Sequence, residues 1–284
     1  MTTAPVSQPQ SGWGDKPKNA LNISWPWLIT WIYLLVMLVL PTLALFAKSA
    51  TLSPADIWRI ATDPVAVSAF EVTFVTAGVA TAINGVFGLA TAWVLVRYDF
   101  PMKRFVDAAI DLPFALPTAV AGLTLATVYS DNGWIGSLLA PLGIKVSFTR
   151  LGVGLAMIFI TLPFIVRTVQ PVLQEIEKEI EEAAWSLGAS DWQTFSRVLF
   201  PPLIPALLTG LALGFSRAVG EYGSIVIISA NIPFDNLIAP VLVFQRLEQY
   251  DYAGATVIGT VMLLVSLAIL VGINLLQAWG RQYD

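Results

Sequence analysis

The chain has 284 residues, of which 56% are hydrophobic and 12% are charged. Soluble domains hold about 25% charged residues, so this composition indicates an integral membrane protein. The chain has no cysteine, no histidine and a net charge of only -4, which excludes disulfides, cysteine or histidine catalysis and the commonest zinc sites, and gives no reason to expect a nucleic-acid partner.

Residues 1–24 are polar and show no hydrophobic periodicity, so we expect a disordered cytoplasmic tail there. Six apolar blocks follow, and each is long enough to span a bilayer. All six should be helical, because a backbone inside a membrane must satisfy its hydrogen bonds internally. The first block is too long for the apolar core of a signal peptide, which favours a retained anchor. The blocks lie at about 27–47, 72–96, 108–129, 151–169, 203–230 and 253–276.

The distribution of lysine and arginine predicts the orientation. With the N-terminus in the cytoplasm, nine of these residues fall in inner segments and five in outer segments. Positive residues accumulate on the cytoplasmic side, so we expect both termini there. Proline recurs inside the later blocks and should kink or locally unwind them, at Pro113, Pro117, Pro163 and Pro205.

The segment 170–202 is polar and separates the fourth block from the fifth. Apolar residues recur in it at helical spacing and predict one stripe on an otherwise acidic helix. Gly188 follows the stripe, where the end of a helix favours a residue that reaches positive φ without strain. The stripe contains Ile176, Ile180, Ala183, Ala184 and Leu187.

A second start signal comes directly after this glycine. Ser190 and Gln193 have the S-x-x-Q spacing of a capping box, which predicts a helix from Asp191 to about Phe200. Proline disrupts a helix interior, so Pro201 and Pro202 should stop this helix. The segment 170–202 is therefore expected to be a helix, a glycine turn and a second helix outside the membrane.

The fifth block contains two opposite charges. Arg217 and Glu221 are four residues apart, hence on one face of a helix. A charge at membrane depth is costly, so the two should pair and face the protein interior. Two interpretations stay open: Arg217 attracts a passing anion, or the pair is structural. Ser216 and Ser224 lie nearby and are able to donate to an anion, although close helix packing is their alternative role.

Two smaller patterns in the blocks have structural interpretations. Gly210 and Gly214 form a G-x-x-x-G, which we interpret as a helix contact. Asp107 and Asp111 are four residues apart near the start of the third block, where acids favour the N-terminal end of a helix dipole. No intramembrane protease motif accompanies them, so catalysis is not expected. There is no P-loop, so ATP hydrolysis would have to come from a separate subunit.

The segment 170–202 also carries a family resemblance. The residues Glu182-Ala183-Ala184, Gly188 and Phe200-Pro201 follow the spacing E-A-A-x3-G-x9-I-x-L-P, which resembles the EAA signature of ABC importer permeases. The consensus isoleucine and leucine are replaced by Val198 and Phe200, which are also apolar. The resemblance implies a cytoplasmic coupling helix that docks into an ATPase subunit, in place of an ordinary amphipathic surface helix. The implied coupling residues are Ile180, Glu182, Ala183, Ala184, Leu187 and Gly188.

Three further stretches are similar to the permeases of sulfate and thiosulfate ABC importers, specifically the CysT-type subunit: 111–124, 163–173 and 217–231, with weaker support from 244–252. This resemblance implies an all-α, six-span, type I ABC importer permease in a bacterial plasma membrane or a related organelle membrane. The chain would not be an enzyme and would hold no cofactor or metal of its own.

The same resemblance implies several partners: a second, CysW-type permease, two ATPase subunits that bind ATP and Mg, a periplasmic sulfate-binding protein and the lipid bilayer. The nearest alternative is a permease for molybdate or another oxyanion. Alternatives from other classes are a secondary transporter and an intramembrane enzyme.

Overall fold

The structure is a computed structural model that describes residues 25–280, without the side chains of 274 and 276–280. Every regular element in this range is helical, which confirms the all-α prediction. The expected disordered tail, residues 1–24, lies outside the described residues. The chain divides into two units, residues 1–47 and 48–284, and each is described by itself.

The first unit holds the first apolar block. The helix α1 (Trp25–Leu34), a π-helical turn η1 (Leu35–Val39) and α2 (Leu40–Ser49) form a continuous helix of 25 residues. The π-helical turn comes directly before Pro41. A wider turn of this kind relieves the clash between a proline ring and the carbonyl of the preceding turn, so the helix continues through the proline.

The second unit begins with capped helices. Ser53 accepts a hydrogen bond from the Asp56 amide at the start of α3 (Pro54–Ala61), and Asp63 accepts from Val65 and Ala66 at the start of α4 (Pro64–Arg97). Both helices also have proline in their first turn, where no backbone donor is lost. The start of the 34-residue helix α4 is therefore determined by its own first residues, Asp63 and Pro64.

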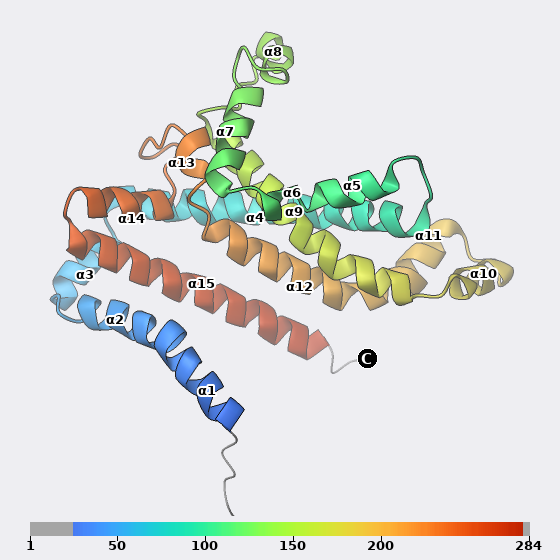
Figure 1. Ribbon diagram of the computed structural model, residues 1–284, viewed down its shortest axis with the longest axis horizontal. Helices are drawn as coiled ribbons and strands as arrows, with labels where there is room; N and C mark the ends of the chain where they lie inside the picture. The colour runs from blue at the N-terminus through green and yellow to red at the C-terminus, as the bar shows by residue number, and fades with distance from the viewer. Residues whose placement is uncertain (1–24, 281–284) are drawn as a thin grey trace, which may run out of the picture. The chain divides into compact units, whose positions relative to one another are not determined.

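Three long helices form the core of this unit: α4, α9 (Arg150–Glu175) and α12 (Phe200–Val219). They lie side by side in Figure 1. Gly210 and Gly214 of α12 face Ile165 of α9, and a Cβ on Gly210 would lie 3.0 Å from the Ile165 Cα. The predicted G-x-x-x-G helix contact is thus confirmed, because only glycine allows the two backbones to approach so closely.

The third apolar block is not one continuous helix. It is divided into α5 (Lys103–Ile110), α6 (Leu112–Ala115) and α7 (Thr118–Val128). The local unwinding predicted at Pro117 is confirmed, because Leu116 is held in an extended conformation by this proline. With 11 residues, α7 is about 16 Å long, well short of a bilayer core of about 30 Å.

The fifth block is also shorter than expected. The helix α12 ends at Val219, and the chain continues as a non-helical turn into α13 (Ile225–Ile228), so a single helix over 203–230 is wrong. Five helices are long and apolar enough to cross a membrane in the described range. The membrane boundaries and the location of the termini stay predictions.

The expected stop at Pro201 and Pro202 is wrong as well. The short helix α11 (Asp191–Thr194) continues through a π-helical turn η3 (Phe195–Leu199) into α12. The Phe200 amide donates to the Phe195 carbonyl, five residues back, so the π-helical turn again directly precedes proline. The helix runs without interruption from Asp191 to Val219.

The other elements are short or lie near the end of the chain. They are α8 (Gly136–Leu139), the 3-10 helix η2 (Ala140–Leu142), α10 (Lys178–Ser186), α14 (Ala239–Glu248) and α15 (Tyr252–Gly280).

Candidate functional site

The helix α10 ends in the predicted glycine turn. Gly188 has φ of 87°, a conformation that strains residues with a Cβ. The Ala189 amide donates to the Ala184 carbonyl over 3.0 Å, and the Gly188 amide donates to the Trp185 carbonyl over 2.9 Å. These two bonds form a Schellman motif, which satisfies carbonyls at the end of the helix. The turn prediction is confirmed.

The capping box at the start of α11 is also present. The Gln193 amide donates to the Ser190 hydroxyl over 3.3 Å, and the Ser190 amide donates to the Gln193 side chain over 2.9 Å. The connection between α10 and α11 is therefore fixed at both ends, by the Schellman motif at the end of α10 and by the capping box at the start of α11. The α10–α11 segment is therefore joined to the long helix α12 without a break in the helix.

The helix α10 has two different faces. One face carries the exposed apolar stripe of Ile180, Ala183 and Leu187, and Leu187 is 89% exposed. The opposite face, with spacing i, i+3, i+4 and i+7, lines a groove and consists of Lys178, Glu181, Glu182 and Trp185. Of the expected coupling residues, Glu182 therefore lies on the groove face, away from the stripe.

A buried ion pair fastens α10 to the end of α4. Arg97 Nη2 lies 2.7 Å from Glu181 Oε1, and the two side chains are only 9% and 11% exposed. The same nitrogen donates to the Ile176 carbonyl over 3.2 Å. The guanidinium also lies 5.8 Å from the centre of the Trp93 ring, a cation–π distance. Arg97 thus holds both the start and the middle of the loop segment against a spanning helix.

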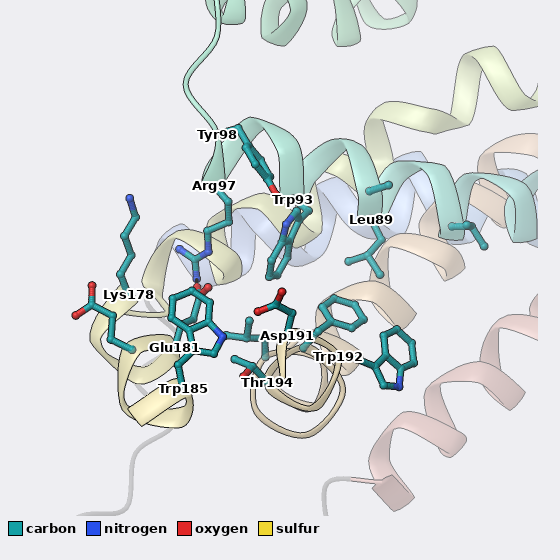
Figure 2. Close-up of a pocket in the computed structure, with 15 residues that line it drawn as sticks. Leu89, Trp93, Arg97, Tyr98, Lys178, Glu181, Trp185, Asp191, Trp192 and Thr194 are labelled. Carbon is teal, nitrogen blue, oxygen red and sulfur yellow. Dashed lines mark ion pairs between the residues drawn. The ribbon is translucent and has the colours of Figure 1, made fainter. Parts of the chain in front are cut away.

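The groove lies between the last turns of α4 and the α10–α11 segment and has a volume of about 960 Å³. Figure 2 shows side chains from both walls around it, among them Trp93 of α4, Trp185 of α10 and Asp191 of α11. Three of the ten tryptophans of the chain, Trp93, Trp185 and Trp192, line this groove. Tryptophan concentrates at the interface between membrane and water.

A second cluster joins the broken third block to α9. Arg167 donates to both carboxylate oxygens of Asp111 over 2.8 and 2.7 Å and to Asp107 over 2.7 Å. The helix-dipole expectation fits Asp111, which is the N-cap residue of α6 although it makes no capping hydrogen bond, but it is wrong for Asp107, which lies inside α5. Their role is instead to hold α5 and α6 against α9 through one shared cation.

Arg217 and Glu221 form the predicted ion pair. They do not lie on one helix, however, because α12 ends before Glu221. Arg217 Nη1 lies 2.5 Å from Glu221 Oε2. Glu221 follows the end of α12 rather than lying on the helix, and its other oxygen accepts from the Ser224 amide and hydroxyl, each over 2.8 Å. The Glu221 and Ser224 side chains are buried, whereas Ser216 is exposed and the Arg217 side chain is 33% exposed.

One exposed carboxyl outside the spans has a shifted pKa. Asp99 follows Arg97 in the turn between α4 and α5, and Lys103 donates to it over 2.9 Å. This hydrogen bond, together with the positive charge of Lys103, lowers the pKa of Asp99. The Asp99 carboxylate therefore stays ionised at lower pH than an unperturbed aspartate would.

The sequence analysis did not predict the ion pairs of Arg97 and Arg167. Both arginines entered it only as positive charges that determine orientation, and Glu181 was one of several acidic residues on the predicted helix. A signal existed for Arg97, because an arginine in the last turn of a spanning helix interacts favourably with the helix end. Its pairing with Glu181, 84 residues away, depends on tertiary structure.

The described residues define a helical membrane protein of several spans, whose polar loop is fastened to one span and continuous with another. The chain belongs to the family of binding-protein-dependent transport system inner membrane components, whose model matches residues 84–281.

Curated relatives match along nearly the whole chain. The sulfate transport system permease protein CysT of Synechocystis sp. is 66% identical over 262 residues, which cover 92% of each chain. The probable sulfate transport system permease protein cysT of Chlorokybus atmophyticus is 64% identical over 263 residues, covering 93% of this chain and 92% of the relative.

Solved structures show the same fold. A bacterial ABC transporter involved in alginate import matches with a TM-score of 0.74 at 17% identity, covering 88% of this chain and 93% of that one. A chain of the inward-facing MetNI methionine ABC transporter matches with a TM-score of 0.57 at 19% identity, covering 82% and 100%. The type I ABC importer permease fold is thereby confirmed.

Proposed function

We propose that the chain is the permease subunit of an ATP-driven sulfate importer. The observation that carries this proposal is identity of 64–66% to sulfate permeases along more than nine-tenths of the chain. This identity is much higher than the fold alone requires, because the alginate and methionine transporters share the fold at only 17–19% identity. The chain itself acts as a transporter subunit and not as an enzyme.

The proposed complex contains a second, CysW-type permease, two ATPase subunits that bind ATP and Mg, and a periplasmic sulfate-binding protein. The alginate transporter, which has the same fold, was solved in complex with a periplasmic protein. The multi-pass chain would lie in a bacterial inner membrane or in an organelle membrane derived from one. Both termini and the α10–α11 segment would then be cytoplasmic.

The exposed stripe of α10 is the proposed contact with the ATPase. Ile180, Ala183 and Leu187 are exposed, so a partner is able to bury them. Apolar burial stabilises association by about 25 cal/mol per Å². When the ATPase dimer closes, α10 would move with it, and two rigid links would pass the displacement on: the Arg97–Glu181 pair to α4 and the continuous helix from α11 to α12.

The proposed sulfate path runs past Ser216 and Arg217, the two exposed members of the group in the fifth block. Glu221 and Ser224 are buried beneath them and would hold Arg217 in position. Pairing with Glu221 cancels the net charge of Arg217, so an anion would be attracted only weakly. Weak binding favours release, which an importer needs at this stage of transport.

Uptake by membrane vesicles tests the proposed function. Sulfate uptake should require ATP, the ATPase subunits and the binding protein, and should persist when ion gradients are dissipated. Uptake driven by a gradient alone would identify a secondary transporter instead. Competition with thiosulfate and molybdate then determines the substrate: strong inhibition of sulfate uptake by molybdate would favour the broader oxyanion permease.

A further inference from the structure

The Arg97–Glu181 pair in the wall of the groove belongs to the coupling described above, but the space of the groove itself, between α4 and the α10–α11 segment, has no role there. Its α10 wall is the face with Glu181 and Trp185, opposite to the exposed stripe with Ile180 and Leu187. An ATPase that covers the stripe would therefore leave the groove on the other side of the helix. The groove is therefore open to a different occupant.

The polarity of the groove changes along its length. At one end it is lined by the apolar side chains of Val86, Leu89 and Ala90 on the spanning helix α4. At the other end it is lined by charged residues and tryptophans from the end of α4 and from α10 and α11. An occupant that matches this change is apolar at one end and polar at the other, and this is the chemistry of a membrane lipid.

The length of the groove also fits one lipid leaflet. Val86 and Arg97 are eleven residues apart on α4, which corresponds to about 17 Å along a helix. One leaflet contributes about half of a hydrocarbon core of about 30 Å. Val86 and its neighbour Phe87 are 67% and 64% exposed, so the apolar end of the groove is open toward the bilayer.

The charges at the polar end select the headgroup. Arg97 and Glu181 neutralise each other, which leaves Lys178 against the carboxylates of Glu182 and Asp191. The remaining charge is negative, so an anionic headgroup is repelled. Carboxylates only accept hydrogen bonds, and a headgroup rich in donors therefore fits best. Trp93 and Trp185 add flat apolar faces with a polar N–H.

We propose that this groove binds a membrane lipid with an uncharged, hydroxyl-rich headgroup, such as a glycosyl diacylglycerol, in the cytoplasmic leaflet. The acyl chain lies along Val86, Leu89 and Ala90. The sugar hydroxyls donate to Asp191 and Glu182, and the sugar ring packs on tryptophan. A lipid in this position would fill the space beside the Arg97–Glu181 pair and keep water away from it.

Photolabelling of the assembled transporter tests the proposal. The complete complex is reconstituted into phosphatidylcholine bilayers that contain a galactosyl diacylglycerol with a diazirine in one acyl chain, and labelled peptides are identified by mass spectrometry. Labelling should concentrate on residues 86–93 of α4. Unlabelled galactosyl diacylglycerol should suppress it, and phosphatidylglycerol should suppress it about tenfold less, which corresponds to about 1.4 kcal/mol of selectivity.

Two matched variants locate the site. Ala90 and Ala82 are both exposed on α4, but only Ala90 lines the groove. Ala90→Trp should remove most of the labelling, whereas Ala82→Trp should leave it intact. Asp191→Ala should reduce the advantage of the galactolipid over phosphatidylglycerol several-fold, because it removes an acceptor and a repelling charge.

Three outcomes would overturn the proposal. Equal suppression by both lipids would mean unselective contact with bulk lipid, and equal labelling in the two tryptophan variants would place the lipid elsewhere. Labelling that appears only after the ATPase or the second permease is removed would mean that a protein partner occupies the groove.

Discussion

Two interior ion pairs of this chain have similar chemistry and very different geometry. Arg97 and Glu181 come from different elements, and both side chains are buried. Arg217 and Glu221 are four residues apart, and the arginine is one-third exposed. The first pair joins a spanning helix to the α10–α11 segment, and we propose a mechanical role for it, whereas the second holds a partly exposed arginine in position. Their different burial predicts different responses to the same substitution.

Arg97→Ala should have the largest effect. Glu181 would lose its ion-pair partner in a buried position, and breaking such a pair costs about 3 kcal/mol or more. The loop should detach from α4, so ATP hydrolysis would continue while sulfate uptake falls to background. The measurement is the ratio of sulfate transported to ATP hydrolysed in proteoliposomes.

The control for this prediction is the exchanged pair. Arg97→Glu combined with Glu181→Arg keeps the attraction and should restore part of the coupling ratio, which neither single substitution should do. If Arg97→Ala leaves the ratio unchanged, the pair has no role in transmission.

Arg217→Ala should have a smaller effect on stability. Glu221 keeps its hydrogen bonds from the Ser224 amide and hydroxyl, so the cost should be about 2 kcal/mol, below that of an uncompensated buried charge. Uptake of sulfate should nevertheless fall strongly if Arg217 lies on the path. Arg217→Lys keeps the charge and should recover part of the uptake; equal loss in both variants at normal membrane levels would point to geometry rather than charge.

The sequence predicted those interactions that join residues close together in the chain. The Gly188 turn, the capping box at Ser190 and the Arg217–Glu221 pair depend on residues at most five apart, and all three are present. The break at Leu116 lies where Pro117 predicted local unwinding, whereas the end of α12 at Val219 was missed because hydropathy averages over residues and does not register where backbone hydrogen bonds end.

The second kind of miss concerns partners far apart in the sequence. Arg167 lies 56 residues beyond Asp111, and Arg97 lies 84 residues before Glu181. No local pattern distinguishes these arginines from the others that determine orientation. The stop predicted at Pro201 failed for a further reason, since a π-helical turn before a proline preserves the helix.

Gly188→Val should have the next largest effect. A Cβ at this position meets nothing within 4 Å, so the cost comes only from the left-handed backbone, about 1–2 kcal/mol. Uptake and association with the ATPase should both decrease, while the amount of protein in the membrane stays the same. Gly188→Asn is the matched control, because asparagine tolerates this conformation better. Normal coupling in the valine variant would contradict the role of the turn.

Ser190→Ala should have the smallest effect. It removes the hydroxyl that accepts from the Gln193 amide, and losing such a cap costs about 1 kcal/mol. Since α11 is continuous with α12, the helix itself should persist and only its first turn should fray. We therefore expect a modest decrease of uptake and faster amide hydrogen exchange limited to residues 191–194. Ser190→Asp keeps an acceptor and should restore protection. Exchange that spreads into α12 would instead mean that the cap stabilises the spanning helix as a whole.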